Sequence, residues 1–239
     1  KEKKNNVKVI VGISPGFSFN FKEFKKKNKQ NKTSKDFNIL TQKSQYFLNN
    51  GANEIALLFD DLPNNFKIIY GNNFLEGKAH ASLTNKLSFV LNKSIFVVPR
   101  IYADQLIIED KNYLLSFDNF INKNNYTFYS GKNIVAKKIN HSTIHSISRH
   151  IKTKIVIWDN FYSNDYCPRR IFLGPYIGRS EINDIMTNPT GLIETDLLIL
   201  DIIKKTKNSI NPMLDWKKVL VKNKIPIEFF DICKFFLKP

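Results

Sequence analysis

The stretch EIALLFDDLP, residues 54–63, decides the fold of this chain. Its apolar run from Ile55 to Phe59 is typical of a strand buried on both faces, as the strands of parallel sheets are. Two carboxylates, Asp60 and Asp61, follow the run directly, and Pro63 then signals a turn. The stretch therefore predicts a buried parallel strand that ends in a pair of acids.

The acid pair has two interpretations, and both stay open at this point. Buried acids are costly without a partner or a task, and neighbouring carboxylates repel each other, which raises the pKa of one of them. A proton donor beside an anion is the arrangement that acid/base chemistry on a sugar requires. In the alternative interpretation the chain simply turns after the strand, and both aspartates are solvated or cap the next helix.

The rest of the chain alternates between predicted strands and predicted helices. The candidate strands are residues 7–13, 54–60, 94–99, 126–130, 155–160 and 184–188. Helical periodicity fills the intervals, over residues 37–50, 73–91, 113–122, 142–150 and 192–206. This alternation favours an α/β protein with a parallel sheet. Polar residues gather where the strands end, as they do at the active-site face of a (β/α)8 barrel.

Several short strings along the chain match one known family in order. They are Ile13–Gly16, Ala56–Asp61, His80–Ala81 with Asn85, Val156–Asn160, Asn164–Tyr166, Gly174–Tyr176 with Gly178–Arg179, and Thr187–Pro189. Together they resemble glycoside hydrolase family 84, the β-N-acetylglucosaminidases that include protein O-GlcNAcases and hyaluronidase-like enzymes. The resemblance extends from Val7 to Asp196.

The resemblance implies a fold of the (β/α)8 TIM-barrel type that is N-terminally incomplete. Residues 7–16 look like the third strand of the family barrel, so about six of the eight strands of a closed barrel are present. We expect residues 1–206 to form a partial (β/α) barrel catalytic domain and residues 207–239 to form a helical extension packed on it. The first and last predicted strands should then be exposed edges of the sheet.

The resemblance also implies retaining, substrate-assisted hydrolysis of terminal β-linked N-acetylglucosamine (GlcNAc). In such a reaction the acetamido oxygen at C2 of the sugar attacks the anomeric carbon, so the enzyme supplies no nucleophile. Asp60 matches the family residue that accepts a hydrogen bond from the acetamido N–H. Asp61 matches the general acid/base. Both side chains can reach one pocket only if the strand ends or bends here, because neighbouring side chains of a regular strand point to opposite faces.

Three further matches fall in the second half of the chain, and each has a plain structural alternative. Trp158 resembles an aromatic wall of the acetamide pocket, or it packs in the core. Asn160 resembles a residue near the acetamide oxygen, or it caps the end of a strand. Asp165 matches a carboxylate that binds the outer hydroxyls of the sugar, or it is an exposed loop acid.

The remaining matches complete the candidate site. Asn188 matches another hydroxyl-binding residue, although Asn-Pro is also an ordinary turn signal. Tyr102 aligns with a tyrosine near the reaction centre, within a divergent stretch from Arg100 to Ala103. Ser130 stands where the family often has threonine. We expect no metal and no cofactor, because the four histidines and two cysteines lack ligand spacing and no glycine-rich phosphate loop occurs.

Composition allows a competing interpretation that involves nucleic acid. The chain of 239 residues has a formal net charge of +16, which is compatible with a basic nucleic-acid-binding protein. Lysine supplies almost all of this charge, whereas base readers tend to use arginine, and the abundance of Lys, Asn, Ile and Phe is typical of an AT-rich genome. We therefore expect no nucleic-acid partner. Steep salt dependence of binding would indicate the contrary.

A GlcNAc-bearing glycan or glycoprotein is the partner that the resemblance implies. A non-catalytic GlcNAc-binding remnant is the main rival interpretation, and hydrolysis of an aryl GlcNAc glycoside separates the two. No apolar run reaches the roughly 18 residues that suggest a membrane span, and no signal peptide is recognisable, although the chain starts at Lys1. A cytoplasmic location is the default expectation, and nothing in the sequence indicates an oligomeric state.

Overall fold

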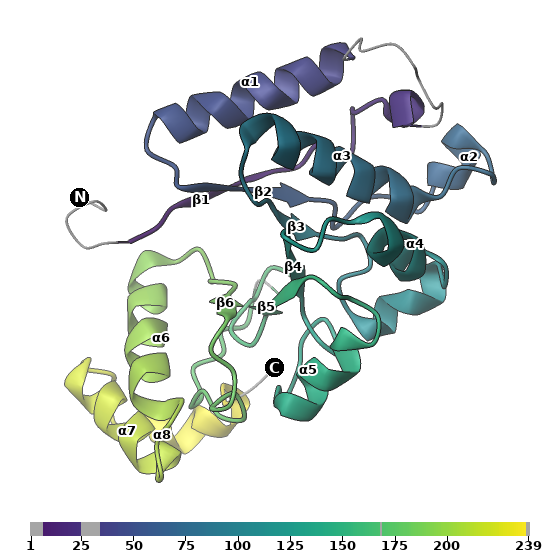
Figure 1. The fold of residues 1–239 in the computed structure, drawn as a ribbon. Helices are drawn as coiled ribbons and strands as arrows, with labels where there is room; N and C mark the ends of the chain where they lie inside the picture. Colours follow the sequence, from purple (N-terminus) through teal and green to yellow (C-terminus); the bar gives the residue numbers. More distant parts are fainter. Residues whose placement is uncertain (1–6, 25–33, 168, 238–239) are drawn as a thin grey trace. The chain divides into compact units, whose positions relative to one another are not determined.

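The computed structural model describes residues 7–24, 34–167 and 169–237. The chain divides into two compact units (Figure 1). Unit 1 comprises residues 1–129 and 147–156, and unit 2 comprises residues 130–146 and 157–239.

The strands follow one another in sequence order from β1 to β6. Their bounds are β1 Ile10–Ile13, β2 Glu54–Leu58, β3 Phe96–Val98, β4 Tyr126–Tyr129, β5 Lys154–Asp159 and β6 Ile185–Thr187. The pairs β1–β2, β2–β3, β3–β4 and β5–β6 are parallel. Every predicted strand is found, and the incomplete (β/α)8 type of fold is confirmed.

In unit 1, helices connect the strands of the parallel sheet. They are α1 Lys35–Asn49, α2 Phe66–Tyr70, α3 Glu76–Leu91 and α4 Tyr113–Phe120, with short 3₁₀ helices at Phe21–Phe24 and Asp104–Glu109. Helix α1 begins where the Ser34 side chain accepts a hydrogen bond from the Phe37 N–H, the usual N-cap arrangement. It ends before Gly51, whose φ of 109° suits glycine best.

Helices α3 and α4 pack closely because Gly77 has no side chain. A Cβ atom at this position would lie 2.2 Å from the Tyr113 carbonyl oxygen and 2.8 Å from the Phe117 nitrogen. The buried residues Ala79, Leu83 and Leu87 of α3 are part of the core of unit 1. The close approach brings the first turns of α3 and α4 together at the carboxyl ends of β2 and β3, where side chains of a site are expected.

Unit 2 has a core built from the segment after β5 and from C-terminal helices. The helices are α6 Ile193–Thr206, α7 Pro212–Lys222, α8 Phe229–Ile232 and the 3₁₀ turn Cys233–Phe235, while α5 His141–Ser148 crosses the boundary between the units. Trp216 and Leu220 of α7 share a hydrophobic cluster with Ile199 and Ile202 of α6. Residues 227–237 of the expected helical extension contain two short turns, α8 and the 3₁₀ turn. The division at residues 206 and 207 stays a prediction.

The sheet has two end strands among the residues that the structure describes. Strand β1 pairs only with β2, and β6 pairs only with β5. The residues of β1 alternate between exposed and half-buried, as expected for an edge. The expected edges are thus found within the described ranges. Among the described residues, no helix is long and apolar enough to cross a membrane.

Candidate active site

The acid pair lies in a sharp turn directly after β2. The strand ends at Leu58, and the Phe59 N–H still donates to the Val98 carbonyl oxygen at 2.9 Å. Asp60 is half-buried and Asp61 is exposed. Asp61 has a φ of 55°, in the left-handed region that aspartate tolerates better than most residues. The strand therefore ends at the pair, which is the condition that the sequence set for both acids to serve one pocket.

Burial changes the acidity of the Asp60 carboxyl. It is the main cause that raises the pKa of the Asp60 carboxyl above its ordinary value, and the neighbouring charge of Asp61 raises it further. A hydrogen bond with the backbone of Asp60 opposes this shift. A raised carboxyl pKa means that Asp60 holds a proton over a wider pH range than a solvated aspartate does. The chemical roles of the two acids stay a prediction.

Tyr102 is half-buried in the loop that follows β3. Arg100, two residues earlier, holds this loop: its Nε lies 3.0 Å from both Glu76 carboxylate oxygens, and its Nη1 lies 2.8 Å from Glu109 Oε2. Arg100 and Glu76 are both buried. Sequence reasoning treated this stretch only as a divergence from the family. In the structure, Arg100 forms a buried ion pair with Glu76, the first residue of α3.

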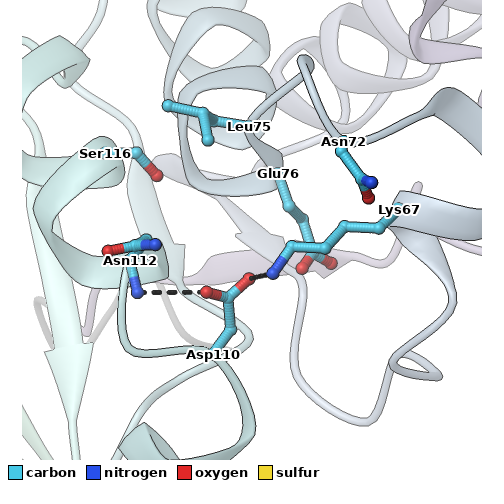
Figure 2. A pocket seen from close by; sticks show the side chains of 7 residues that line it. All are labelled: Lys67, Asn72, Leu75, Glu76, Asp110, Asn112 and Ser116. Atoms are coloured by element: carbon cyan, nitrogen blue, oxygen red, sulfur yellow. Dashed lines mark hydrogen bonds and ion pairs between the residues drawn. The ribbon is translucent and has the colours of Figure 1, made fainter.

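A polar cavity of about 220 Å³ lies beside this ion pair (Figure 2). Its lining is Lys67, Asn72, Leu75, Glu76, Asp110, Asn112 and Ser116. Lys67 Nζ is 3.1 Å from Asp110 Oδ2, and Glu76 forms an ion pair with Arg100. Each of the two carboxylates therefore has a cationic partner. None of the sequence-predicted site residues is among these lining residues.

In unit 2, four of the predicted residues join in one hydrogen-bonded cluster. Asn160 is its centre: its Oδ1 accepts from Trp158 Nε1 at 3.0 Å and from Asn188 Nδ2 at 3.1 Å. Asn188 Nδ2 also donates to Ser163 Oγ at 3.2 Å, and Ser163 Oγ donates to Asp165 Oδ1 at 2.5 Å. The ends of β5 and β6 thus place Trp158, Asn160, Asp165 and Asn188 together, with Ser163 as a link that the sequence did not suggest.

A buried ion pair lies behind this cluster. Asp159, between Trp158 and Asn160 in sequence, accepts from Arg179 Nε at 2.8 Å and from the Tyr176 hydroxyl at 2.6 Å. Arg179 also donates to the carbonyl oxygens of Lys137 and Ala136. Arg179 therefore ties the loop after β4 to the end of β5. The matched strings contained Asp159, Tyr176 and Arg179, but only the fold reveals that they touch.

Ser130 directly follows the last residue of β4. The Ser130 Oγ atom is buried and has no hydrogen-bond partner within the described part of the chain. Buried hydroxyls usually have a partner, and the role of Ser130 as a substrate contact stays a prediction. Across the described ranges, no group of three or more His, Cys, Asp or Glu side chains is placed to hold a metal ion.

Comparison with known proteins decides the family. A family model described as beta-N-acetylglucosaminidase matches residues 1–198. The chain belongs to this family. The protein O-GlcNAcases of Rattus norvegicus and Mus musculus are each 28% identical to it over 206 residues, which cover 81% of this chain and 21% of theirs. The chain thus spans about a fifth of the length of these curated relatives.

Solved structures share the fold at lower identity. The structure of CpGH84B superposes with a TM-score of 0.74 at 20% identity, over 96% of this chain and 40% of that one. A mutant O-GlcNAc hydrolase of Thermobaculum terrenum has a TM-score of 0.75 at 21% identity, over 92% of this chain and 48% of that one. The family named by these comparisons is the one that the sequence strings resemble.

Proposed function

We propose that this chain contains the acid/base machinery of a retaining β-N-acetylglucosaminidase that releases terminal β-linked GlcNAc from glycoconjugates. The observation that carries the proposal is the pair Asp60–Asp61, in the turn at the carboxyl end of β2, in a chain of the beta-N-acetylglucosaminidase family. The curated relatives are named protein O-GlcNAcases, which makes a GlcNAc-bearing protein or glycan the proposed substrate class.

The reaction is substrate-assisted. The acetamido oxygen attacks the anomeric carbon and forms an oxazoline while Asp61 gives its proton to the leaving oxygen. Asp61 then takes a proton from water, which opens the oxazoline and restores the original anomeric configuration. Asp60 accepts a hydrogen bond from the acetamido N–H and so orients the attacking group. Tyr102 lies near the reacting carbon in this proposal.

The cluster around Asn160 has the chemistry of sugar recognition. Carboxamide and carboxylate groups, held in place by one another, match the hydroxyl and acetamide groups of GlcNAc. We assign Trp158 to the wall of the acetamide pocket, Asn160 to the acetamide region, and Asp165 and Asn188 to the sugar hydroxyls. The buried Ser130 Oγ has no hydrogen-bond partner among the described residues, which supports the assignment of Ser130 as a substrate contact.

Hydrolysis of an aryl GlcNAc glycoside tests the proposal. The first sugar product, followed by proton NMR, should be the β-anomer, and a chelator should leave the rate unchanged. Asp61→Asn is the matched control, since it removes the acid without a change of size. An α-anomer as first product would contradict the proposal, and GlcNAc binding without turnover would favour the non-catalytic interpretation.

A further inference from the structure

His80 is a buried histidine of α3 whose ring lies flat on Phe59. The two ring centroids are 4.0 Å apart, and the planes differ by 5°. Phe59 is the residue directly before Asp60, and its N–H bonds to the carbonyl oxygen of Val98 in β3. The stack thus holds the chain at the point where the acid pair leaves the sheet.

The His80 ring also forms a hydrogen bond with Tyr113 through one of its nitrogens. His80 Nδ1 lies 2.8 Å from the Tyr113 hydroxyl oxygen, which also accepts from the Arg100 backbone N–H at 2.9 Å. A backbone N–H can only donate, so the proton of the Tyr113 hydroxyl is free to point at His80 Nδ1. The three groups form a directed chain from Arg100 N–H through Tyr113 O–H to His80 Nδ1.

The second ring nitrogen of His80, Nε2, lowers the stability of the fold. In this chain of hydrogen bonds Nε2 carries the proton, yet it has no partner within the described residues. The ring centroids of Phe21 and Phe66 lie 5.2 Å and 6.1 Å away. Burial, aided by the charge of Arg100, lowers the pKa of His80 to about 3, so the ring is neutral. A buried donor without a partner costs stability, so stability alone does not account for a histidine here.

The pair reaches both loops of unit 1 that carry predicted site residues. His80 holds Phe59, next to Asp60. Tyr113 holds the amide of Arg100, two residues before Tyr102. The Arg100 side chain is fixed in turn by Glu76 at the start of α3. The first turns of α3 and α4 are locked together at Gly77, so the two loops share one rigid support.

We propose that His80 and Tyr113 are positioning residues that set Asp60 and Tyr102 in their places relative to each other. The proposal rests on the function proposed above, because it assigns the pair to the reaction that Asp60 and Tyr102 serve. Neither His80 nor Tyr113 needs to touch the sugar. Their effect passes through the backbone of Phe59 and Arg100.

Two variants and one control test the proposal. Tyr113→Phe removes the bridging oxygen and keeps the ring, while His80→Phe keeps the stack on Phe59 and removes the acceptor. The control is Tyr70→Phe in the same aromatic cluster, whose hydroxyl bonds to the backbone of Phe19 and Phe21 at 3.3 Å. The readouts are kcat and KM on an aryl GlcNAc glycoside, the Asp60 pKa by carboxyl ¹³C NMR, and the unfolding temperature.

We expect Tyr113→Phe and His80→Phe to lower kcat by about ten- to a hundred-fold, as displaced catalytic groups do, with little change in KM. The Asp60 pKa should fall toward that of an exposed aspartate, because a loosened turn admits water. Tyr70→Phe should alter only the unfolding temperature. If His80→Phe does not fold, Tyr113→Phe decides.

An unchanged Asp60 pKa and an unchanged kcat in folded Tyr113→Phe would overturn the positioning role, even with a lower unfolding temperature. If the unaltered chain does not hydrolyse the glycoside, the proposed function fails. The Asp60 titration alone then decides whether the pair positions the turn, so the two failures are distinguishable.

Discussion

Asp61 has a backbone conformation that few residues accept, and this makes asparagine its best isosteric probe. Asparagine tolerates the left-handed region as well as aspartate does, so Asp61→Asn removes the acid without straining the φ of 55°. We expect it to slow substrates with poor leaving groups by about 10²–10⁴-fold, the usual contribution of a general acid. A dinitrophenyl glycoside, whose leaving group needs no proton, should lose far less.

Asp60→Asn supplies the contrast. It should slow both kinds of substrate, because participation of the acetamide is weakened in either case. Rates are compared across a series of aryl glycosides that differ in leaving-group acidity. Equal losses on all members of the series for Asp61→Asn would refute its role as the acid.

Asp60 should also affect stability in a pH-dependent way. Its folded pKa is raised by burial and by Asp61, so the folded state favours the protonated form. The contribution of Asp60 to the free energy of unfolding is fully present below pH 3.8, the pKa of an aspartate in the unfolded chain. It is lost as the pH rises through the pKa of Asp60 in the folded state. We therefore expect Asp60→Asn to be more stable than the unaltered chain at neutral pH.

This difference should shrink to nothing as the pH falls below 3.8. Thermal unfolding of both proteins across the pH range measures it. A gain of stability that persists in acid would mean that packing, and not the charge of Asp60, is the cause.

At the residue scale, the sequence named the acid pair and the residues that cluster around Asn160, whose roles stay predictions, but it missed the ion pairs beside them. Asp60 and Asp61 are adjacent and end an apolar run, so their pattern is local. Arg179 and Asp159 lie 20 positions apart, and nothing in the local pattern links them. Arg100 and Glu76 are separated by 24 positions. Ion pairs of this kind depend on which strand ends meet in the fold.

At the scale of elements, Gly77 sets the distance between α3 and α4. Alanine is favoured over glycine inside a helix by about 1 kcal/mol, so Gly77→Ala would stabilise an isolated helix. In the protein its Cβ would meet the Tyr113 carbonyl oxygen at 2.2 Å. We expect a net loss of about 1–3 kcal/mol, the usual cost of overpacking, with a lower midpoint in denaturant unfolding.

Ser82→Ala on the same helix is the control, because Ser82 is only half-buried and its replacement tests helix propensity alone. It should leave the midpoint nearly unchanged or raise it slightly. A stabilised Gly77→Ala variant would mean that α4 can move away from α3 at little cost.

Every helix predicted from periodicity is found, including the short helices α4 and α5, and the helix that was missed shows no such pattern. Helices α1, α3 and α6 agree with their predicted ranges within a few residues. Helix α2, Phe66–Tyr70, has only five residues and no side-chain cap, so no pattern indicates it. Within the expected helical extension, residues 227–237 form α8 and a 3₁₀ turn in place of one longer helix, and Phe229 and Phe230 pack on the hydrophobic cluster of unit 2.

At the scale of the whole molecule, the edge of the end strand β1 predicts self-association. An unpaired strand edge offers N–H and C=O groups to another chain. We expect the protein to associate as its concentration rises, measured by sedimentation velocity. Ile10→Lys, at an exposed position of β1, should shift the equilibrium toward monomer, since charge on an edge discourages pairing.

Phe89→Lys on α3 is the matched control, because it removes an apolar side chain that is even more exposed but lies away from the edge. If both variants reduce association equally, general surface hydrophobicity is the cause. If neither does, β1 is not where copies meet.

The two buried arginines make the chain its own reporter of local opening. Arg100 belongs to unit 1 and Arg179 to unit 2, whereas Arg149, Arg169 and Arg170 are exposed. A dicarbonyl reagent that modifies guanidinium groups should label the exposed three at once. It should reach each buried one only when its own unit opens. Peptide mass spectrometry over time would therefore reveal whether the two units unfold together or one after the other, without any introduced label.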